Sequence, residues 1–347
     1  MRERIEAKWI AAFRQMFELC RVSPGETVAI YSETLSRQVN VHLAELALVD
    51  LGAKAFHVVS PTPPQRVAIP VRSTGWSDAV QHVGPVINAL RDSSLVVDLS
   101  VEGLLHSQEL PQIMARGNRV LYVSNEHPEA LERLMPDPAM KERIRRGAAL
   151  LSAASSMHVT SPAGTDLIID VSGAEGSSGW GFADEPGHLD TWPGGLVSCF
   201  PGSGAVNGRL VLACGDINLT FKRYLERPIT LHFENDYITG IEGEGVDADL
   251  FRSYIAGWGD REAYASAHVG WGMNQRARWD ALVMYDKSDT NGTEQRAFAG
   301  NFLFSTGVNP QAGRTTRGHF DLPLRHCTIC LDGRAVVESG RLSDGWA

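Results

Sequence analysis

Two side chains that commonly bind metal ions stand two residues apart in the segment GHFDLP at 318–323. If this segment is extended, His319 and Asp321 lie on one face of the strand and Phe320 lies on the other. The imidazole and the carboxylate could then converge on one ion. The same short pattern also arises by chance in ordinary hydrogen-bonded pairs, so it needs a third ligand to become a metal site.

His268 is the best candidate for that third ligand. Gly270 and Gly272 follow it closely and would let the backbone pack tightly around a site. Two imidazoles and one carboxylate form the ligand set of mononuclear non-haem iron(II) oxygenases, which leaves coordination positions for a substrate oxygen and for dioxygen. A closed structural zinc site would need a fourth protein ligand. We therefore predict that His268, His319 and Asp321 hold one divalent metal, with iron(II) preferred.

Two further residues are candidates for acting on a substrate. His106 follows an apolar segment at 95–99, so we expect it at the sheet edge where α/β proteins bind ligands. Its neutral imidazole, with an ordinary pKa of ~6.5, could accept the proton of a metal-bound hydroxyl group, although a structural histidine is the alternative. Ser305 lies in a segment expected to be a loop, where it could contact a substrate or only stabilise a turn.

Other reactive residues favour structural interpretations. Cys327 and Cys330 have the spacing of a zinc or redox pair, but no second pair accompanies them, and their strand-like setting indicates two small buried residues. Glu175 is expected to be solvated. A structural role is also favoured for the remaining histidines: His42, His57, His82, His127, His158, His188, His232 and His326.

The first third of the chain alternates short apolar strands with helical patterns. Helices are predicted at 5–20, 36–51, 78–90 and 111–115, and strands at 27–31, 55–59, 95–99 and 119–123. Strands that are apolar on both faces are typical of parallel sheets covered by helices. Residues 1–135 are therefore predicted to form an α/β domain with a mainly parallel sheet.

The pattern changes after a stretch at 136–146 that is rich in proline and charge. Glycine becomes frequent, and hairpins are predicted at 157–171 and 229–241. A helix is expected at 247–256 and a second one is a weaker expectation at 260–267. Residues 136–347 are therefore predicted to form a mainly β, barrel-like domain that carries the metal site and the catalysis.

The composition restricts the partners of the protein. A length of 347 residues favours two domains, and the net charge of -9 leaves no basic surplus for nucleic acid or anionic membranes. The first residues lack the apolar core of a signal peptide, and no stretch reaches the ~20 apolar residues of a membrane span. Five scattered cysteines are poor material for a disulfide framework. A cytoplasmic enzyme with a small substrate is the expectation.

Over most of its length the sequence resembles the 2,5-dihydroxypyridine 5,6-dioxygenases, the ring-opening enzymes of nicotinic acid and nicotine breakdown. The most recognisable stretches are NVHLAELA at 40–47, PVRSTG at 70–75, VEGLLH at 101–106, VSNEHP at 123–128 and GHFDLP at 318–323.

The resemblance implies that His268, His319 and Asp321 bind Fe(II), and that Leu105, His106 and Ser305 approach the substrate. It also implies conversion of 2,5-dihydroxypyridine, an aromatic N-heterocycle, and O2 to N-formylmaleamate. A homo-oligomer whose neighbouring subunit completes the pocket is a further expectation.

A more remote similarity is to the thermophilic aminopeptidases, which join an α/β domain to a β-rich domain and use two metals. That family has a glutamate shortly after a Pro-Gly motif, whereas Leu196 follows Pro193-Gly194-Gly195 here. His268 occupies the position of its second glutamate. Loss of both carboxylates removes the groups that two adjacent dications need. A metal-dependent hydrolase is therefore the alternative enzyme, and a metal-binding scaffold is the alternative without catalysis.

Overall fold

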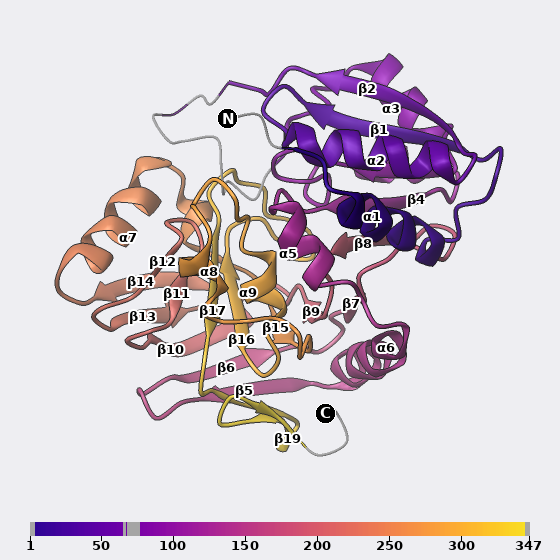
Figure 1. Ribbon diagram of the computed structural model, residues 1–347. Helices are drawn as coiled ribbons and strands as arrows, with labels where there is room; N and C mark the ends of the chain where they lie inside the picture. The colour runs from indigo at the N-terminus through magenta and orange to yellow at the C-terminus, as the bar shows by residue number, and fades with distance from the viewer. Residues whose placement is uncertain (1–3, 65–66, 68–76, 344–347) are drawn as a thin grey trace.

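The computed structural model describes residues 4–64, 67 and 77–343, so the PVRSTG stretch at 70–75 lies outside the described residues. A parallel sheet covered by helices packs beside a larger β-rich region (Figure 1). The predicted combination of an α/β part and a mainly β part is thereby confirmed. None of the helices in the described ranges is long and apolar enough to cross a membrane.

The parallel sheet has five strands in the order β2-β1-β3-β4-β8, and every neighbouring pair is parallel. Its last strand comes from beyond residue 135, so the sheet extends past the segment predicted for the α/β domain, and the division at 135 stays a prediction. The strands are β1 (Thr27–Glu33), β2 (Lys54–Ser60), β3 (Leu95–Asp98), β4 (Arg119–Val123) and β8 (Leu189–Trp192).

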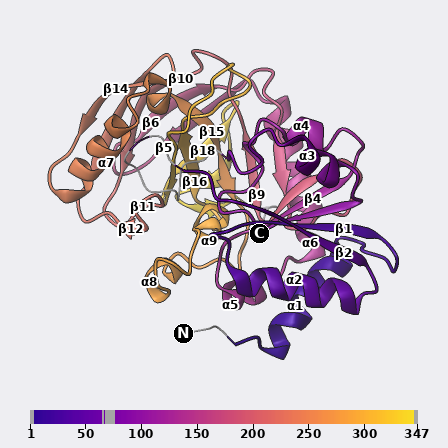
Figure 2. The same cartoon turned by 90° about the horizontal axis from the view of Figure 1, so that it is seen from above.

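Helices cover both faces of this sheet because its strands are apolar on both sides. In Figure 2, α1 (Ala7–Leu19) and α2 (Gln38–Asp50) lie opposite α3 (Gly84–Arg91) and α4 (Leu110–Ile113). All four helices were predicted, but α3 begins at Gly84 instead of residue 78. Gln81 and His82 have positive φ angles of 52° and 55°, which a helix cannot accommodate.

Most of the proline-rich and charged stretch at 136–146 is helical. It forms the first part of α6 (Pro138–Ala153), which follows the short helix α5 (Pro128–Arg133). Asp137 caps α6 by accepting a hydrogen bond from the backbone N–H of Ala139 at 2.9 Å. A capping aspartate followed by proline is a helix-start signal that could have predicted α6.

The β-rich region consists mainly of two antiparallel sheets whose strand orders do not close on themselves. Phe233 of one sheet contacts Phe304 of the other, with ring centroids 5.1 Å apart. The first sheet has the order β14-β13-β10-β6-β5-β18-β19-β20 and the second has the order β17-β16-β15-β9-β7. The first contains β5 (Ser156–Thr160), β6 (Asp166–Asp170), β10 (Val206–Leu212), β13 (Ile229–Glu234), β14 (Tyr237–Glu242), β18 (Thr328–Leu331), β19 (Arg334–Glu338) and β20 (Arg341–Leu342). The second contains β7 (Ser177–Gly179), β9 (Leu196–Cys199), β15 (Ser266–Gly272), β16 (Phe302–Thr306) and β17 (Phe320–Leu324).

Most local predictions in this region are confirmed. The β5–β6 and β13–β14 hairpins pair as expected. The helix α7 (Val246–Gly257) occupies the predicted range, and the short helices α8 (Ala281–Met284) and α9 (Thr293–Ala297) were not predicted. The weaker helix prediction at 260–267 is reduced to one 3-10 turn, Arg261–Tyr264, because β15 begins at Ser266.

Candidate metal centre

Three neighbouring strands bring the predicted metal-binding residues together. His268 lies in β15, Asp321 lies in β17 and His319 directly precedes β17, while β16 runs between these two strands. The pairing of β15 with β16 contains an irregularity between Ser266 and Val269. A bulge of this kind re-aims a side chain out of the regular alternation of a strand. His268 sits within this bulge.

The three side chains form a compact cluster. Their potential ligand atoms all lie within 4.8 Å of one another. Asp321 Oδ1 is 3.4 Å from His268 Nε2, and Asp321 Oδ2 is 3.2 Å from His319 Nε2. Phe320 points the other way and stacks on Phe251 with ring centroids 4.3 Å apart. The arrangement predicted from the His-Phe-Asp spacing is therefore found in the structure.

The protonation states of the cluster suit a metal ion. Burial alone would raise the pKa of Asp321, but the guanidinium of Arg296 and the imidazole of His319 hold that pKa well below its ordinary value. Burial lowers the pKa of His268, although Asp321 opposes this shift. A charged carboxylate and a neutral imidazole are the forms that bind metals. At neutral pH neither group has to lose a proton before it can bind a metal ion.

Backbone contacts orient the two imidazoles in different ways. His319 Nδ1 is hydrogen-bonded to the carbonyl oxygen of Thr306 at 2.7 Å, which turns its Nε2 toward the cluster. His268 is held through its own backbone by the Ser305 hydroxyl. This hydroxyl accepts a hydrogen bond from the His268 N–H at 2.8 Å and donates one to the His268 carbonyl at 2.9 Å.

Ser305 is consequently not the loop residue predicted from the sequence. It lies inside β16, is fully buried and pairs with Asp321 across the sheet. Two glycines near this segment suggested a loop, but the buried strand between them overrides that local signal. Ser305 is also not among the described residues that line the adjacent cavity. In this structure its hydroxyl contacts the strand that carries His268.

Replacing Ser305 with alanine is expected to weaken metal binding about tenfold, the effect typical of a residue that supports a ligand. The bulged backbone at His268 would lose both hydrogen bonds that fix it. Competition with a chelator would measure the affinity. Ser266→Ala is a matched control, because the buried Ser266 hydroxyl makes no hydrogen bond in the described part of the protein. Equal affinities for the two variants would contradict this role for Ser305.

A small cavity of about 160 Å³ lies beside the cluster and contains His106 and Leu105. The ring of His106 is 5.9 Å from that of His319 and makes an edge contact with Phe200 at 6.2 Å. Burial, followed by the neighbouring His319 and His268, lowers the pKa of His106 to about 3. Its imidazole is therefore neutral at ordinary pH. The expected position of His106 at the carboxyl edge of the parallel sheet agrees with the structure.

Two buried carboxyl groups hold the loop that carries Leu105 and His106. Asp98 accepts hydrogen bonds from the N–H groups of Ser100 at 3.0 Å and Leu104 at 2.6 Å. Glu33 accepts one from the N–H of Val101 at 2.9 Å. Burial raises the pKa of Asp98 to about 6 and that of Glu33 to about 7. Sequence reasoning missed both residues. Asp98 directly precedes the loop at the end of β3, whereas only the tertiary structure brings Glu33 to it.

These raised pKa values predict how stability depends on pH. Between the ordinary pKa of Glu33 and its raised value of about 7, the folded protein binds more protons than the unfolded chain. Stability should therefore fall as pH rises through this window, and Glu33→Gln should reduce the fall by on the order of 2 kcal/mol. Urea unfolding of the metal-free protein at several pH values tests this. Glu18→Gln, at an exposed position, should keep the parent slope, and an unchanged slope in Glu33→Gln would refute the prediction.

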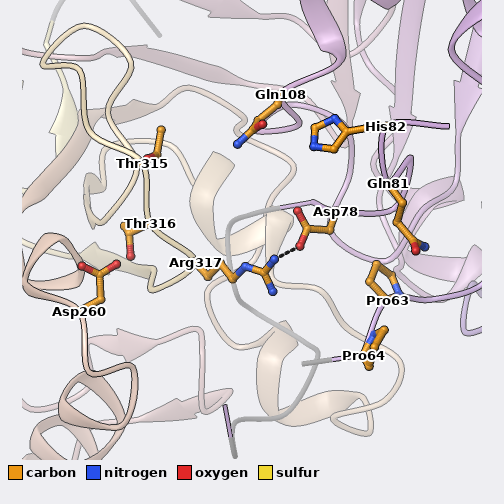
Figure 3. Close-up of a pocket in the computed structure, with 10 residues that line it drawn as sticks. All are labelled: Pro63, Pro64, Asp78, Gln81, His82, Gln108, Asp260, Thr315, Thr316 and Arg317. Carbon is orange, nitrogen blue, oxygen red and sulfur yellow. Dashed lines mark hydrogen bonds and ion pairs between the residues drawn. The ribbon is translucent and has the colours of Figure 1, made fainter. Parts of the chain in front are cut away.

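A second cavity is larger but lacks the metal-binding residues. It has a volume of about 710 Å³ and lies between the parallel-sheet region and the β-rich region. Figure 3 shows Asp78 and Arg317 pointing toward one another across it, and these two residues form an ion pair. The small cavity is the better candidate site, because only it combines apolar walls with the cluster.

The residues of the cluster fit one divalent ion. Asp321 Oδ1 is buried and makes no hydrogen bond with any described residue, which would be costly unless another partner binds there. In the described ranges no fourth histidine, cysteine, aspartate or glutamate joins the group. Three protein ligands leave positions open for other molecules. An α/β-plus-β fold with this cluster at the wall of a cavity is typical of a mononuclear metalloenzyme.

Comparison with known proteins identifies the family. The sequence profile described as 2,5-dihydroxypyridine 5,6-dioxygenase matches residues 8–344. The 2,5-dihydroxypyridine 5,6-dioxygenase of Pseudomonas putida is 39% identical over 338 residues, which cover 95% of both chains. The chain therefore belongs to the 2,5-dihydroxypyridine 5,6-dioxygenase family and is a ring-opening dioxygenase, as the sequence motifs predicted.

Solved structures show the same relationship. The structure of the dioxygenase from Pseudomonas putida KT2440 superimposes with a TM-score of 0.93 and 37% identity, covering 99% of each chain. AmpT from Thermus thermophilus has a TM-score of 0.65 and 14% identity, covering 96% of this chain and 98% of that one. The similarity to AmpT shows a shared fold alone.

Proposed function

We propose that this protein is an Fe(II)-dependent 2,5-dihydroxypyridine 5,6-dioxygenase that produces N-formylmaleamate. The observation that carries this proposal is the cluster of His268, His319 and Asp321 beside a small, partly apolar cavity. The name of the relative from Pseudomonas putida supports the choice of substrate. Bound iron would supply a centre at which an electron-rich ring and dioxygen can exchange electrons. Both oxygen atoms enter the product, so no external reductant is required.

The residues of the cavity have separate tasks in this proposal. His106 accepts the proton of a ring hydroxyl on its neutral imidazole. Leu105 and Phe200 provide apolar surface for a flat ring and exclude water from it. His268, His319 and Asp321 would hold the metal at the wall of the cavity. Degradation of nicotinate or nicotine, a cytoplasmic location and a homo-oligomer stay predictions.

The hydrolase alternative is less well supported. A two-metal peptidase needs bridging carboxylates, but the residue after Pro193-Gly194-Gly195 is Leu196 in β9. Asp321 is the only carboxylate in the cluster found among the described residues. The likeness to AmpT concerns the fold and carries no activity with it.

An assay on the reconstituted protein separates the two functions. Protein loaded anaerobically with Fe(II) is expected to consume O2 and 2,5-dihydroxypyridine in equal amounts, with loss of the ring absorbance and formation of N-formylmaleamate. An oxygen electrode, absorbance and mass spectrometry measure the three changes. Zinc-loaded protein serves as the control and should consume no O2. Peptide hydrolysis with zinc or cobalt, without O2 uptake by the iron form, would refute the proposal.

A further inference from the structure

The two oxygens of Asp321 have different environments. Arg296, on α9, donates its Nε–H to Oδ2 at 2.6 Å, and its Nη1 bonds Asn291 Oδ1 at 2.9 Å. Asp321 Oδ1 makes no hydrogen bond within the described part of the chain and lies 3.4 Å from His268 Nε2. Arg296 also lines the cavity. The guanidinium therefore bonds one oxygen of the carboxylate, which also lies 3.2 Å from His319 Nε2, and the other oxygen has no hydrogen bond from the described residues.

We propose that Arg296 is a positioning residue that restricts Asp321 to one metal-binding oxygen. This inference rests on the metal centre of the proposed function. A carboxylate with two free oxygens can bind an ion through both of them. The second oxygen would then take a position that a mononuclear oxygenase needs for its substrates. By holding Oδ2, Arg296 keeps that position available.

The amino-terminal half of the chain fixes the helix that carries Arg296. Glu126, which is 2% exposed, accepts hydrogen bonds from the N–H groups of Gly292 at 2.9 Å and Thr293 at 3.1 Å, where α9 begins. Arg133 of α5 forms two hydrogen bonds with Glu294 at 2.7 and 2.8 Å. These four hydrogen bonds join α5 and the loop after β4 to α9, which carries the arginine that contacts Asp321.

Because Arg296 is charged, the inference predicts the direction in which metal affinity should change when this residue is replaced. A guanidinium beside Asp321 repels a bound cation and partly neutralises the charge of the carboxylate. Its removal should therefore not weaken metal binding, and the freed Oδ2 could add a second donor atom. General damage to the site would have the opposite effect, because a displaced ligand weakens metal binding. The proposal therefore predicts an equal or higher metal affinity, whereas general damage predicts a lower one.

The test uses Arg296→Gln in the full-length protein. Chelator competition measures Fe(II) and Co(II) affinity, and electron paramagnetic resonance measures binding of nitric oxide, a probe of open positions, to the Fe(II) form. We expect metal affinity to be equal or higher and nitric oxide affinity to fall about tenfold or more. Arg296→Lys keeps the charge and one donor to Oδ2, so it should restore most of the nitric oxide binding.

Two further variants act as a control and as a test of the helix contacts. Arg227→Gln removes an exposed arginine paired with Glu244 and should change neither affinity. Glu126→Gln should lower nitric oxide affinity less than Arg296→Gln does. In the double variant the two effects should not add, since both substitutions act on the contact between Arg296 and Asp321.

Several results would overturn the inference. It is wrong if Arg296→Gln binds metal more weakly than the parent protein, or if nitric oxide binding is unchanged in this variant. It is also wrong if the lysine variant behaves like the glutamine variant. A parent protein that binds neither Fe(II) nor Co(II) would instead refute the metal centre of the proposed function, and this inference with it.

Discussion

An alanine at position 319 is expected to abolish stable iron binding and to lower ring-opening activity by roughly 10³-fold or more, the several kcal/mol that a metal ion contributes. His268 and Asp321 would remain, but two ligands hold a divalent ion poorly. The substitution also leaves the carbonyl of Thr306 without the imidazole that it bonds at 2.7 Å. Metal analysis after gel filtration and an oxygen electrode would measure the two losses.

His158→Ala is a suitable control for this experiment. His158 is exposed on β5 and pairs with Asp166, outside the cluster. The variant should keep both iron and activity. Full iron occupancy in His319→Ala would show that His319 is not a ligand, and the three-residue site would then have to be abandoned. Loss of activity with iron retained would have the same consequence.

The metal cluster could be predicted from the sequence because its geometry is largely local. Side chains alternate along a strand, so the two-residue spacing of His319 and Asp321 was enough to place them on one face. The position of His106 followed from a general rule for parallel sheets, whose strands end at a shared edge. Helices and strands of the amino-terminal part were equally accessible through their periodicity.

Other features depend on contacts between distant segments and left no local signal. Arg296 is one arginine of an unpredicted short helix, and only the fold brings it to 2.6 Å from Asp321. Ser305 was assigned to a loop because glycine-rich surroundings suggest one, whereas pairing with two neighbouring strands makes it part of a buried sheet. The bulge at His268 likewise arises from strand register, which sequence periodicity does not encode.

Removal of the imidazole of His106 is expected to separate proton transfer from metal binding. His106→Ala should retain iron, because His106 is not part of the three-residue cluster. Its kcat/KM should fall about 10²- to 10⁴-fold, the range typical of a lost general base. Iron content and steady-state O2 uptake measure the two properties. His106→Gln, which is polar but not basic, should show the same loss and thereby separate basicity from polarity.

The pH profile gives this prediction a second readout. In the parent protein the pKa of His106 is lowered to about 3, so the base stays neutral and its protonation should cause no loss of activity at mildly acidic pH. In His106→Ala the substrate must release its proton without this base, and a free phenolic hydroxyl has a pKa of ~10. Activity of the variant should therefore rise with pH, and its deficit should be largest in acid. A deficit that does not depend on pH would assign His106 to packing the substrate, since loss of an apolar contact is indifferent to proton concentration.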